Sequence, residues 1–137
     1  MNTLILIKPD ALKRALVGTI VSRFEQAGFV ILEIGMFHHT DLLVEHYAEH
    51  RDKEYFEDLI TSMNQGPLIA MIVQYLSTPA LSVGKARELI GPYKNRVKGT
   101  IRGDYAINDR ENSVHASDSQ EAAIREMSVW FPFFIEE

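Results

Sequence analysis

The sequence predicts an α+β fold, a ferredoxin-like sandwich in which helices cover a four-stranded antiparallel sheet. Four short apolar segments, typical of buried strands, alternate with segments whose apolar residues recur every three or four positions, as in amphipathic helices. No internal repeat, linker or low-complexity stretch interrupts this alternation. We therefore expect a single domain over residues 1–137, although periodicity does not fix the order of the strands.

The chain begins with a strand, a helix and a second strand. Residues 3–7 are continuously apolar and stop at Lys8, which predicts a short strand that is buried on both faces and ends at this lysine. Apolar residues at helical spacing follow and end before Gly28, a natural C-cap. Residues 29–37 are again apolar and are predicted to form the second strand.

The middle of the chain predicts a helical hairpin, a third strand and a further helix. Two apolar stripes at helical spacing occupy residues 41–63, and the pair Gly66-Pro67 ends the second of them. Residues 68–73 then form an apolar run suited to a third strand. Pro79 opens the next helix, which we expect to run to a C-cap at Gly91.

The C-terminal part predicts an irregular loop, a fourth strand and a last helix. The loop covers the basic residues 92–98, and the fourth strand closes at Val114-His115. Residues 117–120 have the Ser-x-x-Gln form of a capping box, which would start the helix with Ser117 as its N-cap. The residues expected on the buried side of this helix are Ile124, Met127 and Phe131.

Composition and charge exclude several classes of function. Apolar residues make up 46% and charged residues 24% of the sequence, as in ordinary globular domains. The chain has no cysteine, so we expect a cytoplasmic location, and neither a signal peptide nor a membrane span is recognisable. Its 14 basic and 19 acidic residues give a net charge of −5, which disfavours nucleic-acid partners. A phosphate would have to be bound by a local basic pocket.

The segment 112–118, Asn-Ser-Val-His-Ala-Ser-Asp, carries the strongest chemical signal. His115 stands where a predicted strand ends and a capped helix begins, so rigid backbone would hold its imidazole beside free N–H groups that favour an anionic phosphoryl group. Near pH 7, one ring nitrogen of a neutral histidine can attack while the other donates a hydrogen bond. Glu126, in the following helix, is the candidate acceptor. The plainer alternative is a partly buried histidine with a structural role.

This segment resembles the Asn-x-x-His-(Gly/Ala)-Ser-Asp signature of nucleoside diphosphate kinases, and His115 matches the histidine that this family phosphorylates. The resemblance continues along nearly the whole chain in family order. Its further matches are residues 3–14 (TLILIKPDALKR), His46-Tyr47, Gly66-Pro67 and residues 99–104 (GTIRGD). The resemblance implies a ping-pong transfer of the γ-phosphate from a nucleoside triphosphate, usually ATP, to a nucleoside diphosphate through a phosphohistidine.

The resemblance also implies roles for individual side chains. The expected contacts to the phosphates and the sugar of the nucleotide come from Lys8, Tyr47, Arg87, Arg102 and Asn112. Tyr55 and Leu59 would form a platform for the base. Stacking on such a platform discriminates little between bases, because every base has a π-face. Ser117 and Glu126 would orient His115. A lysine, two forked arginines and a phenol around one histidine are also the groups that phosphoryl transfer needs.

The cofactor and partners implied by the resemblance are Mg²⁺, nucleoside di- and triphosphates, and further copies of the chain. Mg²⁺ would bridge the nucleotide phosphates and be held mainly by them and by water, with Asp118 as a candidate carboxylate ligand. The homo-oligomer would be a hexamer, built of dimers or trimers, or a smaller assembly.

Two segments depart from the family pattern. The loop at residues 92–98 is shorter than the commonest family form and begins Pro92-Tyr93-Lys94 in place of Thr-Asn-Pro. This difference weakens the expectation of a hexamer. Such short loops resemble versions from large DNA viruses, for which the location would be the host cytoplasm. Across from the base platform, Asn108-Asp109-Arg110 replaces an apolar position, so a preference for pyrimidine or deoxynucleotide substrates is a hypothesis.

Several other functions remain as alternatives. A catalytically silent nucleotide-binding scaffold on the same fold would be expected to have lost the histidine or its phosphate-binding partners. A signalling phosphotransfer module is usually a helical bundle and needs no nucleotide pocket. Nucleic-acid binding is favoured only by residues 94–98, and metal binding only by His46 and His50, which lack the His-Glu-x-x-His order.

Overall fold

The computed structural model describes residues 1–135, so the predicted domain end at residue 137 lies just outside the described residues. Its centre is a four-stranded sheet in the order β2-β3-β1-β4, in which every neighbouring pair is antiparallel. The strands are β1 (Thr3–Ile7), β2 (Phe29–Phe37), β3 (Leu68–Tyr75) and β4 (Val114–Ala116). This arrangement confirms the predicted ferredoxin-like α+β fold.

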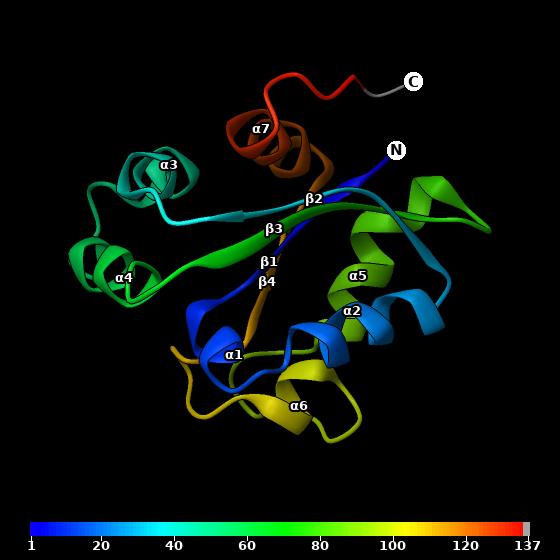
Figure 1. The fold of residues 1–137 in the computed structure, drawn as a ribbon, viewed down its shortest axis with the longest axis horizontal. Coiled ribbons are helices and arrows are strands. Elements are labelled where there is room, and N and C mark those ends of the chain that lie inside the picture. The colour runs from blue at the N-terminus through cyan, green and yellow to red at the C-terminus, as the bar shows by residue number, and fades with distance from the viewer. Residues whose placement is uncertain (136–137) are drawn as a thin grey trace.

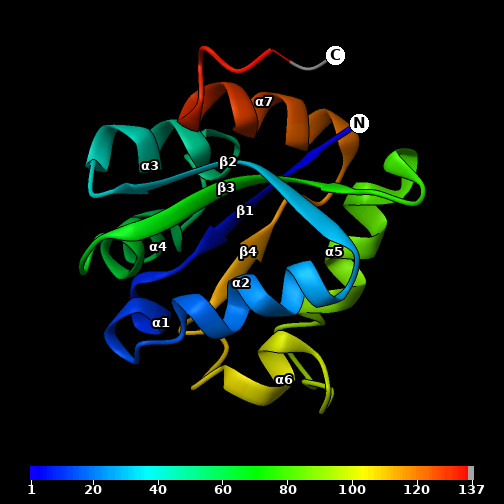
Figure 2. The same ribbon diagram turned by 45° about the vertical axis from the view of Figure 1, so that its right-hand side comes forward.

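Helices cover both faces of the sheet, as Figures 1 and 2 show. One face packs against α3 (Thr40–His46), α4 (Phe56–Met63) and α7 (Gln120–Trp130), and the other against α2 (Val17–Gln26), α5 (Ser82–Ile90) and α6 (Ile101–Tyr105). The remaining elements are α1 (Pro9–Lys13) and two 3-10 helices, Ala48–His50 and Pro79–Leu81. None of the helices in residues 1–135 combines the length and the apolarity needed to cross a bilayer.

The strand β1 is buried along its whole length because it lies between β3 and β4, with helices on both sides. Leu4 and Leu6 belong to the core under α3 and α7, whereas Ile5 and Ile7 belong to the core under α2 and α5. Successive side chains of a strand point to opposite faces, so a strand covered on both faces must be apolar throughout. This is why the continuous apolar run at the start of the sequence predicted β1 correctly.

Two short helices were missed by the sequence prediction. In α1, Pro9 occupies the first helical turn, where its missing N–H costs nothing, although the same residue reads as the end of a strand in the sequence. In α6, the Thr100 side chain caps the helix by accepting a hydrogen bond from the Gly103 N–H at 3.0 Å. Both helices span only five residues, too few for a periodic pattern to appear.

The prediction for the last helix, α7, was partly wrong. Its N-cap is Ser119, which accepts a hydrogen bond from the Ala122 N–H at 3.0 Å, whereas the hydroxyl of Ser117 is used elsewhere. Ile124 is 58% exposed, and Phe131 lies beyond the end of the helix, so only Met127 of the expected stripe is buried within it. The buried residues of α7 are Ala123, Glu126, Met127 and Trp130. A buried carboxylate therefore misled a prediction that assigned apolar residues to the inner face.

We predict that Met127→Ala and Ile124→Ala will have very different effects on stability. Met127 is buried in the core, so its truncation leaves a cavity and should lower the free energy of unfolding by about 2–4 kcal/mol, whereas Ile124→Ala should change it by less than about 1 kcal/mol. Urea unfolding of both variants at equal protein concentration measures this difference. A larger loss for Ile124→Ala would contradict the orientation of α7.

Candidate active site

The pairing of β1 with β4 brings together residues that lie about a hundred positions apart in the sequence. Directly after β1, the backbone N–H of Lys8 donates to the Ser113 carbonyl at 3.0 Å, which extends the ladder beside His115. The Lys8 ammonium donates to Asn112 Oδ1 at 2.9 Å and to the Arg110 carbonyl at 3.2 Å. The end of the sheet thus fixes a lysine and an amide close to the histidine of β4.

Two hollows open at this end of the sheet. A larger one of about 500 Å³ is lined by Lys8, Tyr55, Leu59, Tyr93, Lys94, Asp109, Arg110 and Asn112. A smaller one of about 200 Å³ has among its lining residues His46, Tyr47, His50, Arg87, His115, Asp118, Arg125 and Glu126. The larger hollow has the size of a small-molecule pocket, and the smaller one gives access to His115.

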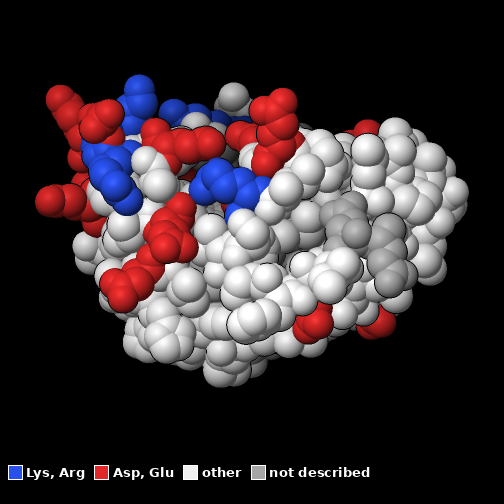
Figure 3. All heavy atoms as spheres, turned by 90° about the horizontal axis from the view of Figure 1, so that it is seen from above, with Lys and Arg blue, Asp and Glu red and all other residues white. Residues whose placement is uncertain are grey.

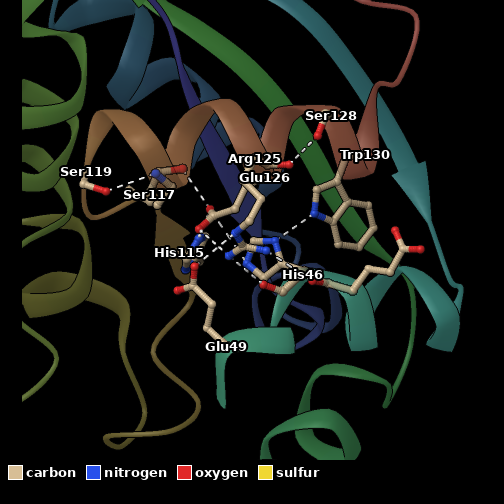
Figure 4. A network of polar contacts seen from close by, with 12 residues as sticks. His46, Glu49, His115, Ser117, Ser119, Arg125, Glu126, Ser128 and Trp130 are labelled. Atoms are coloured by element: carbon tan, nitrogen blue, oxygen red, sulfur yellow. Dashed lines mark hydrogen bonds and ion pairs between the residues drawn. The ribbon is translucent and has the colours of Figure 1, made fainter. Parts of the chain in front are cut away.

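His115 is held by a carboxylate from α7. Its Nε2 lies 2.9 Å from Glu126 Oε1, and the Ser117 hydroxyl donates to the same oxygen at 2.8 Å (Figure 4). Glu126 and Ser117 are buried, whereas the side chain of His115 keeps 19% of its surface exposed. A carboxylate oxygen accepts hydrogen bonds, so the Nε2 of His115 carries the hydrogen.

This hydrogen bond leaves the other ring nitrogen of His115, Nδ1, with its lone pair. Within residues 1–135, Nδ1 has no hydrogen-bond partner. Burial, and then the positive charges of Lys8, Arg102 and Arg87, lower the pKa of His115 to about 3. The imidazole is therefore neutral near pH 7 and able to act as a nucleophile.

Three cations surround this neutral imidazole. Arg102 donates to the Val114 carbonyl from Nε at 3.2 Å and from Nη2 at 2.9 Å, while Arg87 donates to the Ala116 carbonyl at 3.1 Å, so they bind the carbonyls on either side of His115. Burial and then the neighbouring Arg87 lower the pKa of Arg102 to about 10. Within the described part of the chain, neither arginine nor Lys8 forms an ion pair. Their uncompensated charge favours an anion beside His115.

Aromatic residues complete the two hollows. The Tyr47 ring is buried, with its centroid 6.3 Å from that of His115, and burial raises the pKa of its phenol. Tyr55 is 42% exposed, and its hydroxyl oxygen lies 2.6 Å from His50 Nδ1. Tyr55 and Leu59 line the larger hollow together with Arg110, so its walls combine an aromatic and an aliphatic side chain with a cation.

The structure brings the residues singled out in the sequence to one end of the sheet. Four of them line the larger hollow, namely Lys8, Tyr55, Leu59 and Asn112. Five line the smaller one, namely Tyr47, Arg87, His115, Asp118 and Glu126. Arg102 and Ser117 line neither hollow. Arg102 donates to the Val114 carbonyl next to His115, and Ser117 donates to Glu126.

Sequence reasoning missed two residues of this site, His46 and Trp130. His46 was matched to the family pattern and weighed as a metal ligand with His50, but it was given no role in the site. Its Nδ1 accepts a hydrogen bond from the Trp130 indole, and His50 contacts Tyr55. The spacing of Glu126 and Trp130, four residues apart on one helix, is the signal that would have placed both on the same face.

Comparison with known proteins identifies the relatives of this chain. Residues 1–134 match the family model described as "Nucleoside diphosphate kinase". A nucleoside diphosphate kinase of Mycolicibacterium smegmatis is 44% identical over 135 residues, which cover 96% of this chain and 94% of that protein. One from Staphylothermus marinus is 47% identical over 133 residues, covering 95% of this chain and 92% of the relative.

Solved structures show the same relationship. The crystal structure of a nucleoside diphosphate kinase from Encephalitozoon cuniculi superposes with a TM-score of 0.89 at 31% identity and covers 99% of this chain and 92% of its own. That of the Aquifex aeolicus nucleoside diphosphate kinase gives a TM-score of 0.87 at 32% identity, covering 95% and 94%. Sequence and fold therefore agree over nearly the full length of the chain.

The buried ammonium of Lys8 predicts that Lys8→Met stabilises the protein. Burial and then the charge of Arg102 lower the pKa of Lys8 from 10.5 to about 8, so below pH 8 the folded state carries the full cost of the buried charge. The variant should raise the free energy of unfolding at pH 7 by about 1–3 kcal/mol, because the hydrogen bonds that it loses offset only part of this cost.

The pH dependence gives this prediction a defined sign. Between pH 8 and 10.5 the unfolded chain binds the Lys8 proton and the folded chain does not, so the stability of the unaltered protein rises with pH across this window. The advantage of Lys8→Met should therefore shrink from pH 8 to 10 in urea unfolding measurements. Lys53→Met, at an exposed lysine, serves as the control. A less stable Lys8→Met protein at pH 7 would contradict the assigned burial cost.

Proposed function

Because the chain belongs to the nucleoside diphosphate kinase family, we propose that His115 is the residue that carries the phosphoryl group between a nucleoside triphosphate and a nucleoside diphosphate. The chain is an enzyme, a nucleoside-diphosphate kinase, and therefore a phosphotransferase. The observation that carries the assignment of His115 is the hydrogen bond from its Nε2 to Glu126, which leaves the Nδ1 lone pair among three cations.

The reaction follows from this geometry. In the first half-reaction, Nδ1 of His115 attacks the γ-phosphorus of the triphosphate, an N–P bond forms, and the bond to the bridging oxygen breaks, so the electron pair leaves with the diphosphate. The imidazole becomes cationic, and the Glu126 carboxylate stabilises that charge through Nε2–H. In the second half-reaction, a terminal oxygen of another diphosphate attacks the same phosphorus, and His115 returns to its neutral form.

The cationic side chains would bind the transferred group and the other phosphates. Lys8 and Arg102 each keep N–H donors that their protein contacts do not use, and Arg87 is exposed beside the opening to His115. In this proposal Asn112, to which Lys8 donates a hydrogen bond, contacts the sugar, and the phenol of Tyr47, whose ring lies near that of His115, contacts the phosphates. This assignment of roles is supported by the two hollows, which Lys8, Asn112, Arg87 and Tyr47 line, and by the bond of Arg102 to the Val114 carbonyl beside His115.

The base would lie in the larger hollow. Tyr55 and Leu59 offer a surface on which a base can stack without specific hydrogen bonds to its edge, which supports broad base tolerance. Asp109 and Arg110 line the same hollow and could bond a base edge, which supports a modest preference for pyrimidine or deoxynucleotide substrates. The short loop at residues 92–98 is the basis for proposing a short-loop variant of the family, similar to those of large DNA viruses.

Mg²⁺ is the proposed cofactor, bound to the nucleotide phosphates. The donor set fits this metal, because Asp118 presents an exposed carboxylate at the hollow that contains His115, and Mg²⁺ prefers one or two carboxylates with phosphates and water. Held by the phosphates and by Asp118, the ion would neutralise charge and help to align the triphosphate.

A homo-oligomer is the proposed assembly of this single domain. The strand β2 lies at the edge of the sheet and exposes Leu32, Ile34 and Met36, of which Met36 is 65% exposed. Exposed apolar edge strands are sites of self-association. On the face seen in Figure 3, charged side chains gather at one end and leave a wide uncharged area. We place the enzyme in the cytoplasm, that of the host if the source is a virus, as a hexamer or a smaller assembly.

Phosphorylation by labelled ATP tests this function. With γ-labelled ATP and Mg²⁺, the protein should become a phosphoprotein that is labile in acid and stable in base, and it should lose its label to added nucleoside diphosphates. His115→Asn keeps much of the volume and should abolish both steps, lowering the labelling rate by at least about a thousandfold. Substantial labelling of this variant would move the nucleophile to another residue.

A further inference from the structure

The ring of His46 is buried beside His115 and is held by a tryptophan. The Trp130 indole N–H donates to His46 Nδ1 at 3.0 Å, across 84 positions of sequence (Figure 4). An indole nitrogen can only donate, so Nδ1 of His46 must be the acceptor. Burial, and then the nearby His115, lower the pKa of His46 well below its ordinary value, so the ring is neutral. The one hydrogen of the neutral ring is therefore on Nε2.

This Nε2–H is a buried donor without a hydrogen-bond partner within the described residues. The Nε2 nitrogen lies 3.9 Å from Glu126 Oε1, the oxygen that accepts hydrogen bonds from His115 and Ser117. The His46 and His115 rings meet edge to face, with centroids 4.7 Å apart at 78°. A buried donor of this kind costs free energy, so its retention beside a functional carboxylate requires an explanation.

We propose that His46 is a positioning residue for His115, which it serves by directing a fixed N–H dipole at the Glu126 carboxylate and by packing against the His115 ring. The inference rests on the proposed role of His115. The dipole keeps Oε1 an acceptor, so that His115 presents Nδ1, and not Nε2, to the phosphate. Trp130 supports this effect indirectly, because without its N–H the His46 ring can adopt the other tautomer and turn a lone pair toward Glu126.

A metal site is the competing explanation for the same cluster. Candidate ligand atoms of His46, His115 and Glu126 lie within 4.8 Å of one another. However, a nitrogen that carries a hydrogen has no lone pair for a metal, and the contacts of Trp130 and Glu126 place hydrogens on Nε2 of both histidines. The arrangement thus suits hydrogen bonding and not coordination.

Single-turnover phosphorylation of four variants tests the proposal. His46→Leu keeps an apolar volume without a donor, whereas His46→Gln keeps an N–H near the position of Nε2. Trp130→Phe removes only the indole N–H and part of the ring. Phe37→Leu is the matched control, because Phe37 packs edge to face on Trp130 with centroids 5.3 Å apart and has no contact with the His46 nitrogens.

We expect the maximal phosphorylation rate to fall by about 10-fold or more in His46→Leu and by a smaller factor in Trp130→Phe, while the ATP concentration for half-maximal rate changes less than about threefold. His46→Gln should recover most of the rate, and Phe37→Leu should match the unaltered protein. Equal rates for folded His46→Leu and the unaltered protein, or equal losses in the Gln and Leu variants, would overturn the proposal.

Nitrogen-15 NMR of the unaltered protein decides the point even where a variant does not fold. His46 should show a protonated Nε2 and an unprotonated Nδ1, and Trp130→Phe should mix the two tautomers. A protonated Nδ1 in the unaltered protein would refute the proposal.

The unaltered protein and His115→Asn are labelled in parallel with γ-labelled ATP. Absence of label on His115 would contradict the proposed function itself, whereas normal labelling of both the unaltered and His46→Leu proteins would contradict only the role of His46.

Discussion

The hydrogen bond between His115 Nε2 and Glu126 is the interaction on which the proposed role of His115 depends. Its two partners come from different elements, β4 in the sheet and α7 above it, so it forms only when the sandwich is assembled. By placing the ring hydrogen on Nε2, it leaves the lone pair on Nδ1, the nitrogen that we propose as the nucleophile. The Ser117 hydroxyl shares the same oxygen and fixes the carboxylate. The geometry of the proposed site is therefore a direct consequence of tertiary packing.

The site keeps this geometry at a cost in stability. Lys8 and Arg102 are buried without carboxylate partners in the described residues. Burial lowers the pKa of both, with a further contribution from the charge of Arg102 at Lys8 and from that of Arg87 at Arg102. The strand β1, apolar along its length, anchors the backbone that carries Lys8, so a well-packed core supports a strained electrostatic arrangement. An incoming phosphate supplies the missing negative charge, which is why the folded chain favours its anionic substrate.

Much of this structure was readable from the sequence, and the errors have physical reasons. Strands β1 and β3 were found because buried strands are continuously apolar, and β2 was found from a similar run although several of its side chains are exposed. Gly28 and Gly91 were recognised as helix ends from the preference for glycine at C-caps, and both have positive φ in the structure. The inner face of α7 was misread because it includes a buried carboxylate, Glu126, which hydrogen bonds to His115 and Ser117. The contact of Trp130 with His46 could not be predicted, since it joins residues 84 positions apart whose types also suit an ordinary core.

The site of phosphorylation within the His115 ring tests the central claim most directly. The phosphoprotein would be prepared from ATP and Mg²⁺, and phosphorus-31 and nitrogen-15 NMR would identify which ring nitrogen is bonded to phosphorus. The hydrogen bond to Glu126 predicts phosphorylation on Nδ1, with the hydrogen retained on Nε2. A phosphorus atom bonded to Nε2 would contradict the account, because that nitrogen would have to leave Glu126 before it could react.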